Sequence, residues 1–185
     1  MNRKAGVIVV ATKQARVIRP LTQADAHAYA QYMNLPAVYV PAAALPPADD
    51  EAAARIIGLT LQAGAAFAVL APEDERVVGH VEVAPRIGED GAPDDTAVEL
   101  AYVLAPSEWH KGLMTRALRA VLQPLFTNGI RTVWCTVYTD NVPSRRLLKR
   151  LGFQKVGTQI SSTFQSTSRQ MQEEWRLFKV DWQRN

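Results

Sequence analysis

The chain has 185 residues, of which 48% are hydrophobic and 21% are charged, a balance that is ordinary for a globular domain with one buried core. Its single cysteine excludes an intramolecular disulfide and favours a reducing, intracellular setting. The net charge of +3 does not by itself indicate a nucleic-acid surface, because the basic residues cluster at two places and do not form one stripe.

The amino-terminal residues, MNRKAGVIVVATKQAR, place basic residues before a short apolar run. That run, at 6–11, is shorter than the roughly 7–15 apolar residues of a signal peptide. No stretch of the sequence approaches the roughly 20 apolar residues of a membrane span. We therefore expect a soluble, cytoplasmic protein, with 1–15 as an N-terminal extension that contains a short strand.

The first half of the chain predicts a strand, two helices and a hairpin. Pro20 ends the strand, Thr22 is the expected N-cap of the first helix, and Asp49 and Asp50 favour the start of the second. The expected elements are a strand at 16–20, a helix at 23–33, a proline-rich irregular stretch at 34–48, a helix from 49 to about 62, strands at 66–71 and 77–83, and a flexible loop at 85–95.

The second half alternates strands with helices. Pro124 should kink or end the first of these helices, and Gly152 closes the second. The expected elements are a strand at 97–104, a helix at 112–126, a strand at 132–138, a helix at 143–151, and two antiparallel strands at 153–160 and 171–182. Helices on both faces of a mixed sheet make the fold α/β or α+β, and no repeat or linker divides the single domain at 1–185.

The stretch ELAYVLAPSEWHKGLMTRALR, at 99–119, contains a candidate anion site. Gly112 precedes a helix whose first turn has free backbone amides and the positive end of the helix dipole, which suits a pyrophosphate. Lys111 and Arg116 add positive charge there. The alternative is a glycine-started helix without a ligand, because one glycine is a weak motif.

A second stretch, TVWCTVYTDNVPSRRLLKRLGF, contains a strand, a loop that ends in Asn141, and a helix with a Leu-Gly-Phe exit. Together the two stretches resemble the GNAT superfamily, specifically its ribosomal-protein N-acetyltransferases. The first pattern matches at Glu99, Tyr102, Leu104, Pro106, Trp109, Gly112, Thr115, Ala117 and Leu118, and the second at Asn141, Ser144, Arg145, Leu148, Leu151, Gly152 and Phe153. The motifs cover 99–153, and the element order covers roughly 16–182.

The resemblance implies a mostly antiparallel sheet of about seven strands with a central V-shaped splay, and acetyl-CoA as cosubstrate with no metal. It implies that Glu99 is the base that deprotonates the amine and that Ser144 protonates the departing thiolate, with Tyr138 as the rival acid. The residues it implies for cofactor binding are Tyr102, Val103, Leu104, Trp109, His110, Lys111, Gly112, Leu113, Met114, Thr115, Asn141 and Arg145.

Several side chains have alternative interpretations. His80 and Glu82 share a face of their strand and compete with Glu99 for the role of base. His110 and Met114 are larger than the residues usual in this phosphate loop and could narrow it, although Met114 is expected to pack into the core. Cys135 alternates with apolar neighbours, which indicates a buried thiol and not a nucleophile.

The expected reaction is direct transfer of an acetyl group to a primary amine in a ternary complex, with a protein or peptide α-amine as the leading acceptor, possibly that of a ribosomal protein. Acidic residues at 89–95 weakly favour a second hypothesis, a small amine such as a polyamine, amino sugar or antibiotic. The third is a non-catalytic acyl-CoA-binding module. No membrane or direct nucleic-acid partner is expected, and a monomer and a homodimer both remain open. The acceptor cleft would form from the first helices and the loops at 34–48, 85–95 and 161–170.

Overall fold

The structure is a computed structural model that describes residues 17–88, 91–161 and 170–183. The predicted N-terminal extension at 1–15 and nearly all of the predicted loop at 161–170 lie outside the described residues. The same is true of two of the acidic loop positions, 89 and 90, and of the first residue of the predicted first strand.

The strands of the described residues form one seven-stranded sheet in the order β1-β2-β3-β4-β5-β7-β6. Only β4 and β5 pair in parallel, and every other neighbouring pair is antiparallel. The strands are β1 Ile18–Pro20, β2 Ala65–Leu70, β3 Val77–Ile87, β4 Pro93–Leu104, β5 Thr132–Tyr138, β6 Gln154–Ser161 and β7 Gln170–Phe178. This arrangement confirms the predicted mixed, mostly antiparallel sheet.

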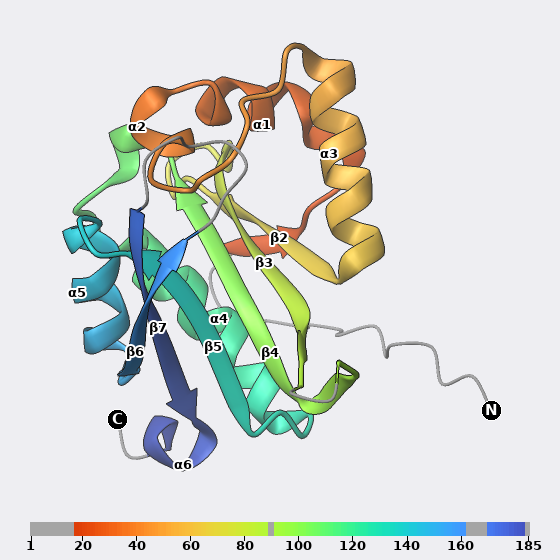
Figure 1. Ribbon diagram of the computed structural model, residues 1–185. Helices are drawn as coiled ribbons and strands as arrows, with labels where there is room; N and C mark the ends of the chain where they lie inside the picture. The colour runs from red at the N-terminus through yellow and green to blue at the C-terminus, as the bar shows by residue number, and fades with distance from the viewer. Residues whose placement is uncertain (1–16, 89–90, 162–169, 184–185) are drawn as a thin grey trace.

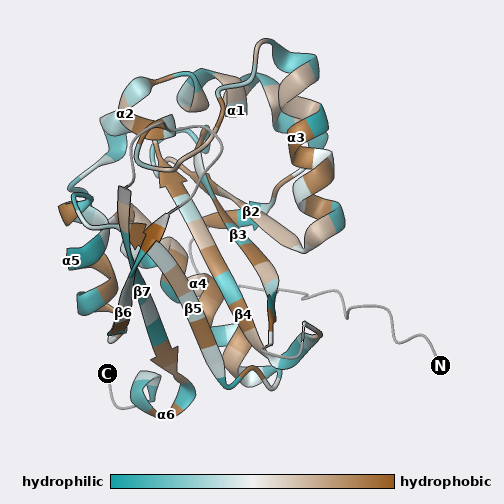
Figure 2. Ribbon diagram, viewed as in Figure 1, coloured by the Kyte–Doolittle hydropathy of each residue, from teal (hydrophilic) through white to brown (hydrophobic). Residues whose placement is uncertain are grey.

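Helices cover both faces of the sheet, as predicted. They are α1 Ala26–Met33, α2 Pro36–Tyr39, α3 Asp50–Ala63, α4 Leu113–Thr127, α5 Val142–Arg150 and α6 Lys179–Trp182. In Figure 1, α4 lies behind β4 and β5, whereas α1 and α3 lie at the end of the sheet formed by β2 and β3. The helices form because their apolar residues recur at helical spacing: the stripe Leu118, Val121, Leu122 and Leu125 of α4 is fully buried. Figure 2 shows hydrophilic residues on α5 and at the two ends of α3, whereas the middle of α3 also exposes hydrophobic residues such as Leu59.

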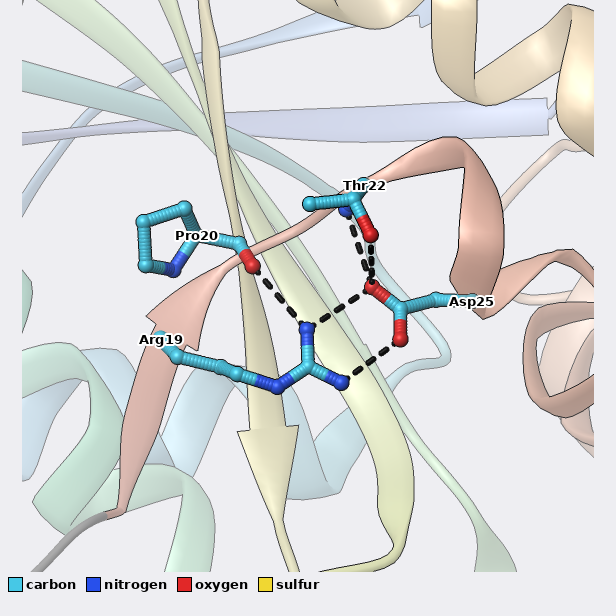
Figure 3. Close-up of polar contacts among 4 residues, drawn as sticks. All are labelled: Arg19, Pro20, Thr22 and Asp25. Carbon is cyan, nitrogen blue, oxygen red and sulfur yellow. Dashed lines mark hydrogen bonds and ion pairs between the residues drawn. The ribbon is translucent and has the colours of Figure 1, made fainter.

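A buried carboxylate fixes the start of the first helical segment (Figure 3). The two oxygens of Asp25 accept hydrogen bonds from Arg19 at 2.8 and 2.6 Å, and one of them also accepts bonds from the backbone amide and hydroxyl of Thr22. These bonds, led by that from Arg19, hold the pKa of Asp25 below its usual value. Thr22 is therefore the N-cap that the sequence predicts, with Asp25 completing a capping box before α1.

Four boundaries differ from the sequence prediction. The predicted flexible loop at 85–95 is largely strand, because the β3–β4 ladder continues through a bulge to the pair Ile87 and Pro93. The irregular stretch at 34–48 contains the short helix α2. Pro124 does not end α4, since a proline near the last turn removes only one hydrogen bond and the helix continues to Thr127. The last strand ends at Phe178 and is followed by α6, whose first amide bonds the carbonyl of Arg131.

No helix within the described part of the chain combines the length and the apolar character that crossing a bilayer requires.

Candidate active site

The sheet opens between its two parallel strands. β4 and β5 are paired only from Ala97 to Glu99, opposite Thr132 to Trp134. Beyond these rungs β4 stays paired with β3 as far as Leu104, and β5 stays paired with β7 as far as Tyr138. Figure 1 shows the two strands side by side at one end and apart at the end near α2 and α5. The edge of β4 that faces β5 therefore has backbone amides and carbonyls without a strand partner, which is the splay that the sequence predicts.

A cavity of about 380 Å³ lies at the open end of the splay, within the usual size range of small-molecule sites. Its walls come from α2, the end of β4, the loop and first turn of α4, and the start of α5. The lining residues are Ala37, Val38, Pro41, Ala42, Tyr102, Val103, Leu104, Glu108, Trp109, His110, Gly112, Leu113, Met114, Thr115, Asn141, Pro143, Ser144, Arg146, Leu147 and Arg150. Ten of the twelve predicted cofactor-binding residues are thus brought together around one cavity.

The first turn of α4 presents its backbone amides to this cavity. Gly112 is the N-cap with φ of 72°, a left-handed conformation that glycine adopts without strain, and no side chain caps the helix there. The first helical bond runs from the amide of Arg116 to the carbonyl of Gly112, so the amides of the preceding residues have no acceptor within the helix. A methyl group at Gly112 would meet no atom within 4 Å. The geometry is that of a helix N-terminal anion site.

The two large residues of the predicted phosphate loop, His110 and Met114, differ in burial. Met114 is 7% exposed and packs into the core, as predicted. His110 is exposed and has a positive φ of 62°, which is uncommon for a residue with a side chain. The indole of Trp109 donates a hydrogen bond to the carbonyl of Leu104 at 2.7 Å, which ties the loop to the end of β4. Met114, His110 and Trp109 all line the cavity.

The positive charge at the cavity does not come from Lys111 or Arg145, the two cations predicted to bind the cofactor. Lys111 forms an ion pair at 3.1 Å with the buried Glu108 and is absent from the lining. Arg145 donates to the buried carboxylate of Glu173 at 2.8 Å and to the carbonyl of Thr139. The cations on the lining are instead Arg146 and Arg150. Both belong to the basic group of the sequence at 145–150, one member of which could meet a phosphate, and their four-residue spacing puts them on one face of α5.

The start of α5 places two polar side chains on the cavity wall. Asn141 is the N-cap of the helix, and its side-chain oxygen accepts a hydrogen bond from the backbone amide of Ser144 at 3.2 Å. Ser144 lies in the first turn, half-buried, with its hydroxyl close to the phenol of Tyr102. Burial raises the pKa of Tyr102 well above its usual value, and the neighbouring thiol Cys135 acts in the same direction, while Ser144 partly opposes this shift.

Glu99 lies on the opposite face of the sheet from Ser144. It is the last β4 residue paired with β5, its side chain is 41% exposed, and it accepts a hydrogen bond from the hydroxyl of Thr136 at 3.4 Å. Arg86 joins it to a second carboxylate: the guanidinium lies 3.3 Å from Glu99 and 2.6 Å from Glu174. The same guanidinium stacks over Trp134 at 4.6 Å. Glu99 is therefore an ion-paired carboxylate on the open face beside the splay, outside the cavity lining.

Tyr138, the rival acid, alternates along β5 with Thr136 and Trp134 and so shares the face of Glu99. It is buried and is not among the residues that line the cavity. The structure thus brings Ser144, and not Tyr138, to the cavity wall.

The rival bases form a separate buried network. His80 is 4% exposed, stacks on Tyr29, and is hydrogen-bonded to Tyr32 at 2.9 Å and to Glu82 at 3.1 Å. Burial is the largest influence on the pKa of Glu82 and acts to raise it, but the hydrogen bond and charge of His80, together with a hydrogen bond from Thr60, outweigh burial and place the pKa below its usual value. Neither His80 nor Glu82 lines the cavity. Their network instead joins α1 to β3.

Cys135 is 2% exposed, as expected for a core thiol. Burial, followed by the charge of Glu99, raises its pKa to about 12, so the thiolate is not populated at neutral pH. Within the described residues, no group of three or more His, Cys, Asp or Glu side chains is arranged to hold a metal ion.

Comparisons with known proteins agree with this geometry. A family model described as an acetyltransferase (GNAT) domain matches residues 16–154. An uncharacterized N-acetyltransferase of Bacillus subtilis (strain 168), YoaA, is 35% identical over 60 residues, which are 32% of this chain and 34% of that protein. The match therefore spans about a third of the relative's length.

Two solved structures share the fold at low sequence identity. The ribosomal-protein-S5-alanine acetyltransferase of Vibrio fischeri superposes with a TM-score of 0.71 at 18% identity, covering 89% of this chain and 93% of that chain. The spermidine N-acetyltransferase of Vibrio cholerae, solved with CoA and spermine, gives a TM-score of 0.75 at 16% identity, covering 90% of this chain and 96% of that chain.

Proposed function

Because the chain belongs to the GNAT family of acetyltransferases, we propose that it transfers the acetyl group of acetyl-CoA to a primary amine, with a protein or peptide α-amine as the acceptor. The observation that carries the proposal is the cavity at the splay, where an unpaired strand edge, a helix N-terminus and two arginines converge. These three features suit a long ligand that has amide groups at one end and phosphates at the other.

The residues at the cavity fit acetyl-CoA, which supplies the acetyl group as an activated thioester. The amides from His110 to Thr115 would hold the pyrophosphate, and Arg146 and Arg150 would add charge around it. The free edge of β4, from Tyr102 to Leu104, would bond the amides of the pantetheine arm.

Glu99 is the proposed base. An amine with a pKa of about 8–10 is protonated at neutral pH and must lose a proton before its nitrogen can attack. Glu99 stands at the last rung before the strands separate, where a nitrogen that enters from the open face would meet the splay. Arg86 and Thr136 hold its two oxygens in place. The carboxylate therefore takes the proton on one side of the sheet, and the acyl donor lies on the other.

Ser144 is the proposed acid, because its hydroxyl lines the cavity whereas Tyr138 does not. As the nitrogen–carbon bond forms, the carbon–sulfur bond breaks and leaves its electron pair on sulfur. Ser144 supplies a proton to that sulfur and regains one from water. Asn141 fixes the backbone of Ser144 through the N-cap bond and so holds the hydroxyl at the wall.

A small polycationic amine is the second candidate acceptor. The observation that favours it is the pair of carboxylates, Glu99 and Glu174, that face the open side of the sheet within reach of one guanidinium. A structure of this fold that is named as a spermidine N-acetyltransferase shows that the architecture accommodates such a substrate in another protein. The protein acceptor stays first because of the motif resemblance at 99–153.

Thermal unfolding with acetyl-CoA, with ATP and NAD as controls, is the first test. A ligand at about a hundred times its dissociation constant stabilises the native state by roughly 2.7 kcal/mol, which raises the Tm by several degrees at this size. CoA release is then measured with peptide amines and with spermidine. We expect Glu99→Gln to lower turnover strongly and to leave the acetyl-CoA shift nearly intact. Binding of acetyl-CoA without CoA release on any amine would indicate a non-catalytic acyl-CoA-binding module. An unchanged Tm at millimolar acetyl-CoA would refute the proposal that the protein is an acetyltransferase.

A further inference from the structure

The phenol of Tyr102 is a buried polar group without a partner. Its ring contributes to the cavity wall, but its oxygen is fully covered and has no hydrogen-bond partner among the described residues. A buried hydroxyl without a partner makes the folded state less stable than a buried hydroxyl that is hydrogen-bonded. Phenylalanine would fill the same space without that cost, so the hydroxyl calls for an explanation.

The position of the phenol limits what it can act on. Tyr102 belongs to the part of β4 that has left β5, and its side chain is directed to the face covered by α4 and α5. The hydroxyl of Ser144 and the thiol of Cys135 are the polar side-chain groups that influence its titration. Cys135 is fully buried behind it, whereas Ser144 lines the cavity with it. Ser144 is therefore the neighbour through which the phenol can reach a ligand.

A serine hydroxyl has one proton and two lone pairs, and it rotates to suit its neighbours. A permanent donor beside its oxygen would fill one lone pair and direct the serine proton away from the donor, toward the cavity. The phenol is suited to this task because burial keeps it protonated across the neutral range.

We infer that Tyr102 is a positioning residue for Ser144: when a ligand occupies the cavity, the phenol donates a hydrogen bond to the serine oxygen and directs the serine proton at the sulfur of that ligand. The inference rests on the proposed function, because it assumes that Ser144 faces the thioester sulfur. The phenol keeps its own proton throughout. Its hydrogen bond also stabilises the negative charge that develops on the serine oxygen as the proton leaves.

The test compares the affinities of CoA and of desulfo-CoA, which lacks the sulfur, by calorimetry near pH 9, where part of the thiol is ionised. The variants are Tyr102→Phe, Ser144→Ala and the double variant, with Tyr29→Phe as the control that removes a buried phenol elsewhere. Wild type should bind CoA about tenfold more tightly than desulfo-CoA. Ser144→Ala and Tyr102→Phe should each lose most of that ratio, and the double variant should lose no more than Ser144→Ala alone. Tyr29→Phe should keep the ratio.

Thermal unfolding of the ligand-free variants gives the second readout. Because the hydroxyl has no partner there, Tyr102→Phe should have a Tm equal to or above that of wild type while its turnover falls about tenfold. A lowered Tm together with an unchanged CoA ratio would assign Tyr102 a purely structural role and overturn the inference. Additive losses in the double variant would overturn it as well. A different outcome separates the two proposals. If Tyr102→Phe and Ser144→Ala lower the affinity ratio of CoA to desulfo-CoA non-additively but the protein acetylates no amine, the proposed function is refuted and the role of Tyr102 is not.

Discussion

The buried carboxylate of Glu173 holds the helix that carries Ser144 to the sheet, and its removal should destabilise the protein. This carboxylate on β7 is 2% exposed and accepts hydrogen bonds from Arg145 at 2.8 Å and from Lys155 at 2.9 Å. Arg145 belongs to α5, which carries Ser144, and Lys155 belongs to β6. Glu173→Gln removes the charge that holds both elements to β7 and leaves two cations without their partner.

The size of the effect follows from the exposure of the partners. Breaking a fully buried ion pair typically costs 3–5 kcal/mol. Here the side chains of Arg145 and Lys155 are 32% and 44% exposed, so water screens part of the interaction. We therefore expect a loss of about 2–3 kcal/mol in the free energy of unfolding at pH 7, near the lower end of that range. At this chain length the loss corresponds to a Tm lower by about 5–10 °C.

The stability that Glu173→Gln loses should be greatest at neutral pH and should disappear in acid. Burial acts to raise the pKa of Glu173, but the bonds from Lys155 and Arg145 outweigh it and the pKa is lowered. A lowered folded-state pKa stabilises the protein above the unfolded pKa of about 4.3, and this stabilisation disappears as the pH falls through the folded value. The Tm difference between wild type and Glu173→Gln should therefore be full at pH 7 and shrink below about pH 4.

Differential scanning calorimetry between pH 3 and pH 8 measures both quantities. Glu51→Gln is the matched control, because Glu51 also pairs with an arginine but its side chain is 83% exposed, and it should cost less than about 0.5 kcal/mol. An equal Tm for Glu173→Gln and wild type at pH 7, or a deficit that stays constant down to pH 3, would refute the assignment of a stabilising buried charge.

Three further variants probe other parts of the structure. Asp25→Asn should lower the free energy of unfolding by about 1 kcal/mol at neutral pH, a modest loss because water screens the partly exposed Arg19. Urea unfolding should show that this difference from wild type disappears in acid, because the pKa of Asp25 is lowered in the folded state. Cys135 should react with a thiol reagent no faster than the protein unfolds, and rapid labelling of the native protein would contradict its burial and its pKa of about 12. Gly112→Ala should cost about 1 kcal/mol through the left-handed φ alone, since nothing obstructs the methyl group, and its Tm should fall by about 2–4 °C.

The local features of the fold could be predicted from the sequence because each depends on neighbours along the chain. The buried stripe of α4 follows from apolar residues at helical spacing, and the N-cap position of Thr22 follows from a residue type that favours helix starts. The glycine at the start of α4 indicated a turn, and the left-handed φ of Gly112 agrees with that turn; the anion site predicted there remains a proposal.

Features that depend on tertiary partners could not be obtained in this way. The residues at 85–95 have turn chemistry, yet most of them are held in a hairpin by a ladder that the composition does not reveal. Arg145 and Arg146 are adjacent and chemically equivalent in the sequence. Only the position of Glu173 on β7 decides that Arg145 turns inward to an ion pair, whereas Arg146 lines the cavity.

The division of the site between two faces has a consequence for specificity. The cavity proposed for the acyl donor lies on the side of α4 and α5, and most of its lining residues come from the motif-bearing stretch at 99–153, with the rest at and just after α2. The open face carries Arg86 and Glu99 from the consecutive strands β3 and β4, and Glu174 from β7, which is far away in the sequence. Most of the proposed donor site can therefore be recognised from one continuous pattern, whereas the proposed acceptor surface depends on the register that brings β3, β4 and β7 together. Acceptor preference is thus open to change by single substitutions at Arg86 or Glu174 that leave the donor cavity untouched.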